Sequence, residues 1–450
     1  MSRPWLTWYA DDFTGATDAL DALTRGGVRA ALFIAPPTRA QLAELGDYEA
    51  VGVAGATRTL PEDELRREVR SGLTALAALE APLCHYKVCS TFDSAPHAGS
   101  VGAATEEGLR ALGGAWVPLL VGVPALGRWC VFGNLFARVG ADGGVRRLDR
   151  HPIAEHPVTP MREADLLRHL AAQTDLPSGL VLTHLAGAGS VERQLGKLRA
   201  DGARVCLLDV ADAEDLAAAG AAIATAGASG EVRLVVGSSG VEYALVEHWQ
   251  RRGVTAPRAP ILAEPVERLV VLSGSCSEVT GRQVAWAAAN GFEELALDTP
   301  ALLGDGADAL LADAAERLDA ALGAGRSVVV HTAVGPRDPR VAAVRERAGG
   351  GGVEAVVGPA LARLGEQAVA RGDVRRLLFT GGDTSSAGAR ALGIAAVDVS
   401  APMLPGAPLC RAHAPGRAVD GLELLFKGGG LGEEGFFARV RDGVAAERLP

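Results

Sequence analysis

Lysine is scarce in this sequence of 450 residues. Of its 44 basic residues, three are lysine: Lys87, Lys197 and Lys427. A compact ammonium and a planar guanidinium are not interchangeable, so a position that keeps lysine is a candidate for a functional cation. Two of the three lysines lie in motifs that stand out for other reasons.

The sequence also lacks the marks of several protein classes. Its formal net charge of −10 argues against the basic face that nucleic-acid binding needs. No apolar run approaches the ~20 residues that span a membrane, and the N-terminus has no secretory signal. The six cysteines show no CxxC spacing, and Walker A and HExxH sequences are absent. These absences predict a soluble, cytoplasmic protein without nucleic-acid or membrane partners, and they leave a homo-oligomer open.

Short β-rich runs alternate with segments of helical periodicity along the whole chain. This alternation is typical of βαβ units and predicts the α/β class, with mostly parallel sheets. Residues 251–265 carry three prolines and no clear period, which indicates a linker. We therefore expect two α/β domains, residues 1–255 and 266–450, with Gly349 to Gly352 as a loop inside the second.

The N-terminal motif joins an apolar run to two adjacent carboxylates. Leu6 to Tyr9 is predicted to be a buried strand, followed by Asp11, Asp12 and Thr14 and then by a helix from Asp18 to Arg25. This turn would lie at the carboxyl edge of a sheet, where open α/β proteins bind ligands. The alternative is that one Asp caps the helix and the other is solvated.

Two further stretches of the first half suit a small polyhydroxy anion. After a probable strand come Lys87, Ser90, Thr91 and Asp93, in which a cation for a carboxylate stands beside several hydroxyls. The alternative is a surface turn with an N-capping serine. The segment from His156 to Met161, which includes Thr159, contains two prolines that restrict its backbone. It suits either a rigid wall of the binding site or the start of a helix.

Three Gly- or Ser-rich turns in the second half each follow a strand. Glycines there let backbone N–H groups approach a phosphate, and a parallel sheet would bring all three turns to one edge. They predict a polyphosphate site, to which Lys427 adds charge and where Asp383 or Thr384 reaches Mg²⁺. The candidate residues for this polyphosphate are Ser273, Ser275, Gly381, Gly382, Asp383, Thr384, Ser385, Lys427, Gly428 and Gly429.

Together these motifs resemble the four-carbon acid sugar kinases from end to end. Five family motifs occur in order: A-D-D-x-T-G-A at Ala10–Ala16, H-P-x-T-P-M at His156–Met161, S-G-S-x-S at Ser273–Ser277, G-G-[ED]-T-S at Gly381–Ser385, and K-x-G-x-x-G from Lys427. The resemblance implies a sugar-acid-binding N-terminal domain and an ATP-binding C-terminal domain. It also implies phosphoryl transfer in an active-site cleft between the two domains.

One departure from the family pattern bears on the substrate. The usual K-x-D-S-T-x-R-G has Cys89 and Asp93 here in place of the Asp and Arg that are expected to touch the sugar acid. A lost guanidinium and a gained carboxylate change what the pocket accepts. We therefore expect a larger or branched 3-oxo acid such as 3-oxo-isoapionate, and the alternative is an ordinary 3-oxo-tetronate with Asp93 in solvent.

The residues leave the mechanism open between several groups. Asp11 and Asp12 are interpreted as orienting the acceptor hydroxyl, with one of them accepting its proton, and Asp383 is the rival base. Two other function classes stay open: an ATP-independent isomerase or aldolase of sugar acids, and a non-catalytic sugar-acid-binding protein. The isomerase or aldolase would leave the three glycine turns without a ligand. A basic DNA-reading helix would favour the non-catalytic protein, and the sequence shows none.

Overall fold

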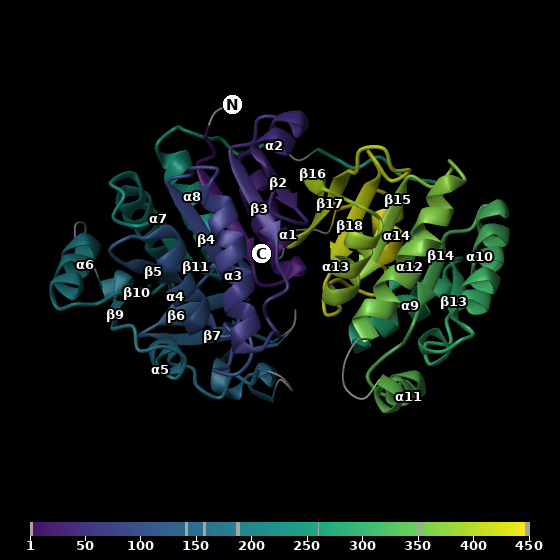
Figure 1. Ribbon diagram of the computed structural model, residues 1–450, viewed down its shortest axis with the longest axis horizontal. Helices are drawn as coiled ribbons and strands as arrows, with labels where there is room; N and C mark the ends of the chain where they lie inside the picture. Colours follow the sequence, from purple (N-terminus) through teal and green to yellow (C-terminus); the bar gives the residue numbers. More distant parts are fainter. Residues whose placement is uncertain are drawn as a thin grey trace. The chain divides into compact units, whose positions relative to one another are not determined.

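The computed structural model in Figure 1 describes residues 3–139, 143–155, 159–185, 190–259, 261–348 and 353–445. The chain forms two compact units, Met1–Arg258 and Ala259–Pro450, called unit 1 and unit 2 below. Helix α8 (Gly240–Arg251) is the last element of unit 1, and strand β12 (Val270–Ser273) is the first of unit 2. The expected loop at Gly349–Gly352 lies outside the described residues.

Unit 1 is built on a parallel sheet whose described strands follow the order β2-β3-β1-β4-β11-β5-β10-β9. Its central strands are buried along their whole length, which explains their continuous apolar runs. The strands are β1 (Leu6–Ala10), β2 (Ala30–Phe33), β3 (Ala50–Ala54), β4 (Leu83–Lys87), β5 (Val117–Leu120), β9 (Ser178–Val181), β10 (Val205–Leu208) and β11 (Leu234–Gly237).

Helices cover this sheet in two groups. Helices α3 and α4 pack together, and α1 packs on α8, which packs on α7 (Figure 1). The helices are α1 (Phe13–Arg25), α2 (Arg39–Leu45), α3 (Glu62–Ala77), α4 (Val101–Leu112), α5 (Leu166–Ala171), α6 (Ser190–Ala200), α7 (Ala213–Ala228) and α8, with 3₁₀ turns η1 (Pro124–Leu126), η2 (Leu148–Arg150), η3 (Pro152–Glu155) and η4 (Thr183–Leu185).

A small antiparallel ribbon, which the sequence patterns did not predict, follows β5. It consists of β6 (Arg128–Val131), β7 (Asn134–Arg138) and β8 (Val145–Arg147). Its first turn has φ of 51° at Phe132 and 73° at Gly133. Hairpin turns with two positive φ angles normally begin with Asn, Asp or Gly, so a phenylalanine at this position does not predict a turn.

Unit 2 repeats the α/β plan in the order β13-β14-β12-β15-β18-β17-β16, parallel up to β18 and antiparallel beyond it. The predicted α/β class with mostly parallel sheets is confirmed. Its remaining elements are β13 (Glu293–Ala296), β14 (Val328–His331), β15 (Arg376–Thr380), β16 (Ala396–Leu404), β17 (Ala407–His413), β18 (Glu423–Lys427), α9 (Glu278–Ala289), η5 (Ala301–Leu303), α10 (Ala307–Gly323), α11 (Pro339–Ala348), α12 (Val353–Ala370), α13 (Gly382–Ala391) and α14 (Phe436–Arg441).

Both sheets reverse their strand order next to their first strand. In unit 1 the chain fills the β2 and β3 side of β1 before it crosses to β4, and in unit 2 it fills the β13 and β14 side of β12 before it crosses to β15. Helices that leave such a switch point on opposite faces open a crevice at the carboxyl ends of the strands. The functional motifs follow the strands at these two points.

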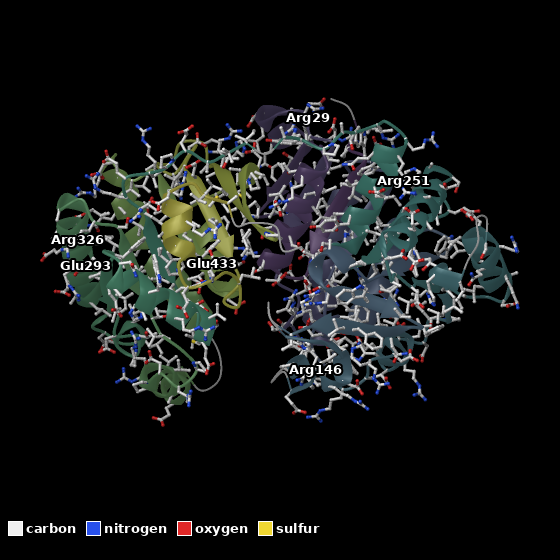
Figure 2. All side chains as sticks on the ribbon, turned by 180° about the vertical axis from the view of Figure 1, so that it is seen from behind. Arg29, Arg146, Arg251, Glu293, Arg326 and Glu433 are labelled. Atoms are coloured by element: carbon white, nitrogen blue, oxygen red, sulfur yellow. The ribbon has the colours of Figure 1, made fainter. Side chains whose placement is uncertain are left out.

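Charged side chains stand on the outside of each unit, as the adjacent Arg326 and Glu293 show in Figure 2, where an ion pair of 2.5 Å joins them. The cores are apolar, and in unit 2 Leu269, Val271, Phe436 and Phe437 belong to one buried cluster. No helix in the described part of the chain has the length and apolar character needed to cross a membrane.

Candidate active site

Arg58 binds both carboxylates of the N-terminal motif in unit 1. Its Nε and Nη2 donate to Asp11 at 3.0 and 2.8 Å, and its Nη1 donates to Asp12 at 2.8 Å. Asp11 follows β1 and Arg58 follows β3, so adjacent parallel strands bring the three side chains to one edge. Such fork contacts are geometrically specific, and they hold the two acids in fixed positions.

Asp12 is also the N-cap of α1. Its Oδ1 accepts a hydrogen bond of 2.6 Å from the Gly15 amide, so the helix begins at Phe13 and not at Asp18 as expected. A side chain at Gly15 would lie 2.5 Å from Asp12 and 3.0 Å from the Lys87 ammonium, which explains a glycine inside the first turn. The capping alternative is therefore correct for Asp12, but Asp11 is paired with Arg58 and is not solvated.

The two acids differ in access to solvent. The side chain of Asp11 is 7% exposed and that of Asp12 is 23% exposed. Burial raises the pKa of Asp11, and Arg58 opposes this shift. Asp12 is therefore the carboxylate that an incoming hydroxyl reaches more readily, while Asp11 mainly fixes Arg58.

Lys87, the last residue of β4, is surrounded by carboxylates. Its side chain is 2% exposed, and its ammonium lies 3.7 Å from Asp18 and donates to the Val88 carbonyl at 3.1 Å. Burial alone would lower the pKa of Lys87, but Asp18, Asp11 and Asp12 outweigh it and raise the pKa. The cation is thus balanced by the protein itself.

The segment after Lys87 is buried and is not a surface turn. Thr91 donates to one oxygen of Asp93 at 2.5 Å, and Thr159 donates to the other at 3.4 Å. Although burial acts to raise it, the pKa of Asp93 is lowered because Arg58 and Thr91 favour the carboxylate. Asp93 is 6% exposed, so it does not point into solvent as the alternative required.

The remaining substrate-binding predictions of unit 1 fall on less constrained positions. Thr14 lies in the first turn of α1 and Ser90 in the Lys87 segment, and both are half-buried. Burial raises the pKa of the Cys89 thiol to about 11, and its sulfur lies 3.0 Å from the Thr91 hydroxyl. His156 lies outside the described residues.

Sequence reasoning missed Arg58 and Asp18, the partners that fix the site electrostatically. Arg58 follows β3 within Gly55-Ala56-Thr57-Arg58, a polar turn after an apolar strand, and this was the available signal. Asp18 lies in α1 one helical turn beyond Thr14, on the side of Lys87. In a chain this rich in arginine and acid residues, neither type of residue stands out.

In unit 2 the three predicted turns meet at one edge of the sheet. Strand pairing aligns Ser273 with Thr380 and Thr380 with Lys427, so the turns leave from adjacent positions. Ser277 caps α9, and its hydroxyl donates to the Gly429 carbonyl at 2.6 Å. Thr280 donates to the same carbonyl at 2.9 Å, which ties the first turn to the third.

Glycine is required where these turns approach each other. A Cβ at Gly274 would lie 2.0 Å from the Thr384 hydroxyl, and one at Gly429 would lie 2.3 Å from the Ser275 hydroxyl. Gly381 has φ of 108°, which favours glycine. The three turns therefore pack so closely that a side chain at Gly274 or Gly429 would clash with the neighbouring turn.

Two buried hydroxyls at this edge have no hydrogen-bond partner among the described residues: Ser273 Oγ at the end of β12 and Ser385 Oγ in α13. Unpaired buried hydroxyls are costly in a folded protein, and a bound group with acceptor oxygens would satisfy them. Backbone N–H groups of α13 begin beside them, because Gly381 is its N-cap. The donor set fits the phosphates of a nucleotide.

Lys427 lies under the three turns without a carboxylate near it. Its ammonium is fully buried and donates to the Thr380 hydroxyl at 3.1 Å, the Gly428 carbonyl at 3.1 Å and the Thr280 hydroxyl at 3.4 Å. Burial lowers the pKa of Lys427 to about 7. A nearby anion favours the charged form of such a group.

The other predicted nucleotide-binding residues occupy the same edge. Gly382, Asp383 and Thr384 form the first turn of α13, with Asp383 exposed and Thr384 buried, and Gly428 directly follows Lys427. No group of three His, Cys, Asp or Glu side chains suited to a metal occurs in the part of the chain that the structure describes.

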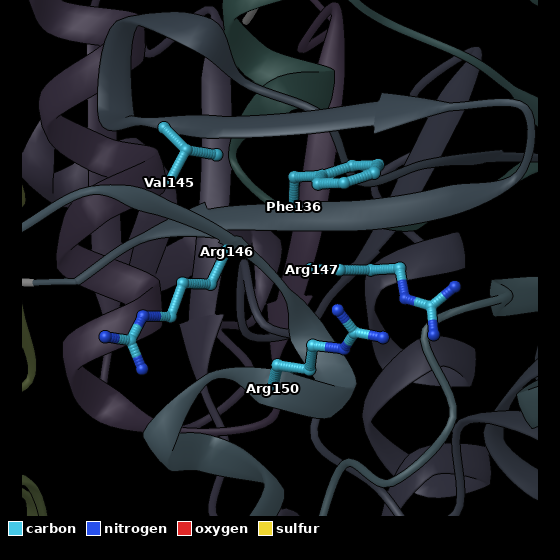
Figure 3. Close-up of a pocket in the computed structure, with 5 residues that line it drawn as sticks. All are labelled: Phe136, Val145, Arg146, Arg147 and Arg150. Carbon is cyan, nitrogen blue, oxygen red and sulfur yellow. The ribbon is translucent and has the colours of Figure 1, made fainter.

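A surface cavity of about 550 Å³ lies on the antiparallel ribbon of unit 1. Figure 3 shows its lining: Phe136, Val145, Arg146, Arg147 and Arg150. Asp149 pairs with Arg147 at 2.6 Å. The cavity contains none of the predicted site residues.

Comparison with known proteins identifies the family. A model described as a sugar-binding N-terminal domain matches residues 6–245, and one described as a nucleotide-binding C-terminal domain matches residues 270–437. A 3-oxo-isoapionate kinase of Paraburkholderia graminis is 43% identical over 98% of this chain and 95% of its own length. The chain belongs to the four-carbon acid sugar kinase family.

Two 3-oxo-tetronate kinases and one solved structure are also similar to this chain along most of its length. A 3-oxo-tetronate kinase of Methylobacterium radiotolerans is 35% identical over 97% of this chain and 98% of its own length, and one of Cupriavidus necator is 34% identical over 90% of each. A solved structure from Salmonella typhimurium, described as a putative tRNA synthase, shares 25% identity and a TM-score of 0.77 over 97% of this chain and 98% of its own.

Family membership confirms the predicted enzyme class, a sugar-acid kinase, and disfavours the isomerase and the non-catalytic alternatives. A kinase with a nucleotide-binding domain implies the use of ATP, as expected from the three turns.

Proposed function

We propose that this member of the four-carbon acid sugar kinase family transfers the terminal phosphoryl group of Mg²⁺-ATP to a hydroxyl of a branched 3-oxo sugar acid such as 3-oxo-isoapionate. The observation that carries the substrate choice is the 43% identity to a 3-oxo-isoapionate kinase along nearly the whole chain, against 35% and 34% for the two 3-oxo-tetronate kinases described above. Residues 1–255 would bind the acid and residues 266–450 the nucleotide.

The surroundings of Asp93 support a substrate with an extra hydroxyl or hydroxymethyl group. An ionised carboxylate accepts up to about four hydrogen bonds. Asp93 accepts a short bond from Thr91 and a long bond from Thr159, and the Cys89 side chain and the Asp93 amide also hydrogen-bond to it. Ser90 and Thr91 add hydroxyls to the same segment. A branched polyol would find acceptors there that a shorter chain does not need.

Asp12 is the residue we assign to the acceptor hydroxyl. It is the more exposed carboxylate of the pair, and its other contacts, to the Gly15 amide and to Arg58, hold it in one orientation. Asp12 orients the hydroxyl and takes its proton as the oxygen attacks. Asp11 fixes Arg58, and Asp383 remains the rival base because it is exposed in the first turn of α13.

The nucleotide phosphates are assigned to the turns of unit 2. ATP supplies the phosphoryl group. Ser273 and Ser385 offer their buried hydroxyls, the turns around Gly274, Gly381 and Gly429 offer backbone N–H groups, and Lys427 offers its ammonium. Preorganised donors of this kind stabilise developing charge without reorganising. Asp383 and Thr384 are the proposed Mg²⁺ ligands.

The decisive experiment compares two acids in an assay of ADP release. We expect ATP-dependent turnover with both 3-oxo-isoapionate and 3-oxo-tetronate, and a higher kcat/KM for the branched acid. A clear preference for the linear tetronate would refute the branched-substrate proposal. Absence of ADP release with either acid would refute the kinase proposal for these substrates. A cytoplasmic location and a homo-oligomer also remain proposals, which fractionation and sedimentation would test.

A further inference from the structure

Arg128 is placed at the carboxyl edge of the unit 1 sheet by a short structured turn. The turn follows β5, passes through η1 and closes where Val123 and Arg128 exchange backbone hydrogen bonds of 2.9 and 3.3 Å. Gly127 adopts φ of 68°, which directs the chain back into β6. Arg128 therefore has a fixed backbone at the edge where Asp12 and Lys87 also lie.

The guanidinium of Arg128 is bonded on one side only. Nη1 donates to the carbonyls of Leu126 at 3.3 Å and Gly127 at 3.0 Å. Nε is buried without a hydrogen-bond partner, and no hydrogen bond joins Nη2 to any described residue. The edge formed by Nε and Nη2 is one of those that bind a carboxylate with two parallel hydrogen bonds.

No described carboxylate forms an ion pair with Arg128, in contrast to Arg58 and Lys87. Burial lowers the pKa of Arg128, and the opposing effects of Cys89 and Asp18 do not offset it. Both of these groups belong to the site described above, so the cation and the site lie within electrostatic range. His151 adds no positive charge beside Arg128, because burial first, and Arg128 and Arg146 in addition, lower its pKa and favour the neutral ring.

We propose that Arg128 binds the carboxylate of the acid substrate through its Nε–Nη2 edge. The inference rests on the proposed function, since it assumes an acid substrate in unit 1. In the usual family pattern an arginine stands at the position of Asp93. The proposal gives the role of that arginine to Arg128, on β6. Lys87 is less suited to this role because Asp18 already balances its charge.

The test compares an acid with its neutral primary amide, both as phosphoryl acceptors. Arg128→Met keeps the apolar stem and removes the charge. We expect its kcat/KM for the acid to fall roughly 10²-fold, mainly through KM, because a charge-assisted bidentate contact is lost. The value for the amide and the KM for ATP should hardly change. Arg128→Lys keeps the charge without the fork and should lose roughly tenfold.

Arg146→Met is the matched control, because Arg146 is an exposed arginine of the same ribbon, at the cavity in Figure 3. It should leave the acid and amide values unchanged. A second readout needs no turnover: calorimetry without ATP should show weaker binding of the acid to Arg128→Met than to the unaltered protein.

Equal losses for acid and amide would overturn the inference, since Arg128 would then only brace the 124–127 turn. Unchanged binding of the acid by Arg128→Met would overturn it as well. Failure of the proposed function looks different: the unaltered protein would bind the acid in calorimetry without releasing ADP, and the Arg128→Met comparison by calorimetry would still decide the role of Arg128.

Discussion

Lys87 and Lys427 each end a strand of the sheet in their unit, and they have opposite electrostatic surroundings. Each is the last residue of its strand, β4 or β18, and each side chain is buried. Asp18 lies 3.7 Å from Lys87, and three carboxylates raise its pKa although burial opposes them. Lys427 meets hydroxyls and a carbonyl, and burial lowers its pKa to about 7.

The difference shows how each unit is prepared for its ligand. A buried charge is tolerated when it is paired, and an unpaired one shifts toward its neutral form. Unit 1 balances Lys87 and Arg58 within the protein, so these cations shape the site and fix the acids. Unit 2 leaves Lys427 unbalanced together with two unpaired hydroxyls, which suits a polyanion that brings the missing charge.

The largest expected effect comes from Lys427→Met. The kcat/KM for ATP should fall roughly 10³-fold, the upper range for losing one preorganised group that faces developing charge. Steady-state kinetics with varied ATP measures it. Lys197→Met is the matched control, because Lys197 is exposed on α6 and the same substitution there should change nothing. An equal loss in both variants would mean that the effect is unrelated to the phosphate site.

Asp12→Asn should act on unit 1 alone. We expect kcat to fall by roughly 10²-fold or more, as for a positioned acid–base group, while the Kd for ATP stays nearly unchanged. Stopped assays give kcat, and calorimetry gives the affinity. A collapse of ATP affinity would place this carboxylate with the nucleotide or its metal, and the contrast between the units would be wrong.

The low pKa of Lys427 predicts that nucleotide binding depends on pH. The free ammonium loses its proton above a pH of about 7, and bound phosphate raises its pKa, so binding above that pH takes up a proton. Affinity for ATP should then weaken up to about tenfold per pH unit as the pH rises from 7.5 to 9. Calorimetry in buffers of different ionisation enthalpy measures the proton uptake.

Lys427→Arg is the control for this pH dependence, because a guanidinium stays charged throughout the range. Its ATP affinity should be flat between pH 7.5 and 9. If the unaltered protein is equally flat, Lys427 is already fully charged before the nucleotide binds.

The sequence predicted the residues at strand ends because the apolar run of a strand and the polar or glycine-rich turn after it are both local patterns. An apolar run followed by Asp11 and Asp12, or by Lys427 and glycines, marks a strand and its turn, and parallel pairing then brings such turns to one edge. The helix start at Phe13 was missed because Gly15, placed there by the closeness of Asp12 and Lys87, weakens the helical pattern.

The partners of these residues were not predictable in the same way. Arg58 and Arg128 come from turns after β3 and β5, and their roles depend on which carboxylates the fold brings near them. Arginine serves as the cation almost everywhere in this chain, so its presence at a given position carries little information. The ribbon that begins at Arg128 was hidden by Phe132 in a turn that normally carries Asn or Gly.

The smallest expected effect, on stability, has opposite signs for the two lysines. Because the folded-state pKa of Lys427 lies below its unfolded value, its charge costs stability, fully below a pH of about 7 and progressively less up to the unfolded pKa. Lys427→Met should therefore raise Tm at pH 6.5, by about 2 °C or more, and hardly at pH 9.5.

The folded-state pKa of Lys87 is raised, so its charge stabilises the fold below the unfolded pKa. Lys87→Met should lower Tm at pH 6.5, since Asp18 loses its partner. Calorimetric scans of both variants and of Lys197→Met decide the matter: a lower Tm for Lys427→Met would show that its charge is compensated in the folded protein.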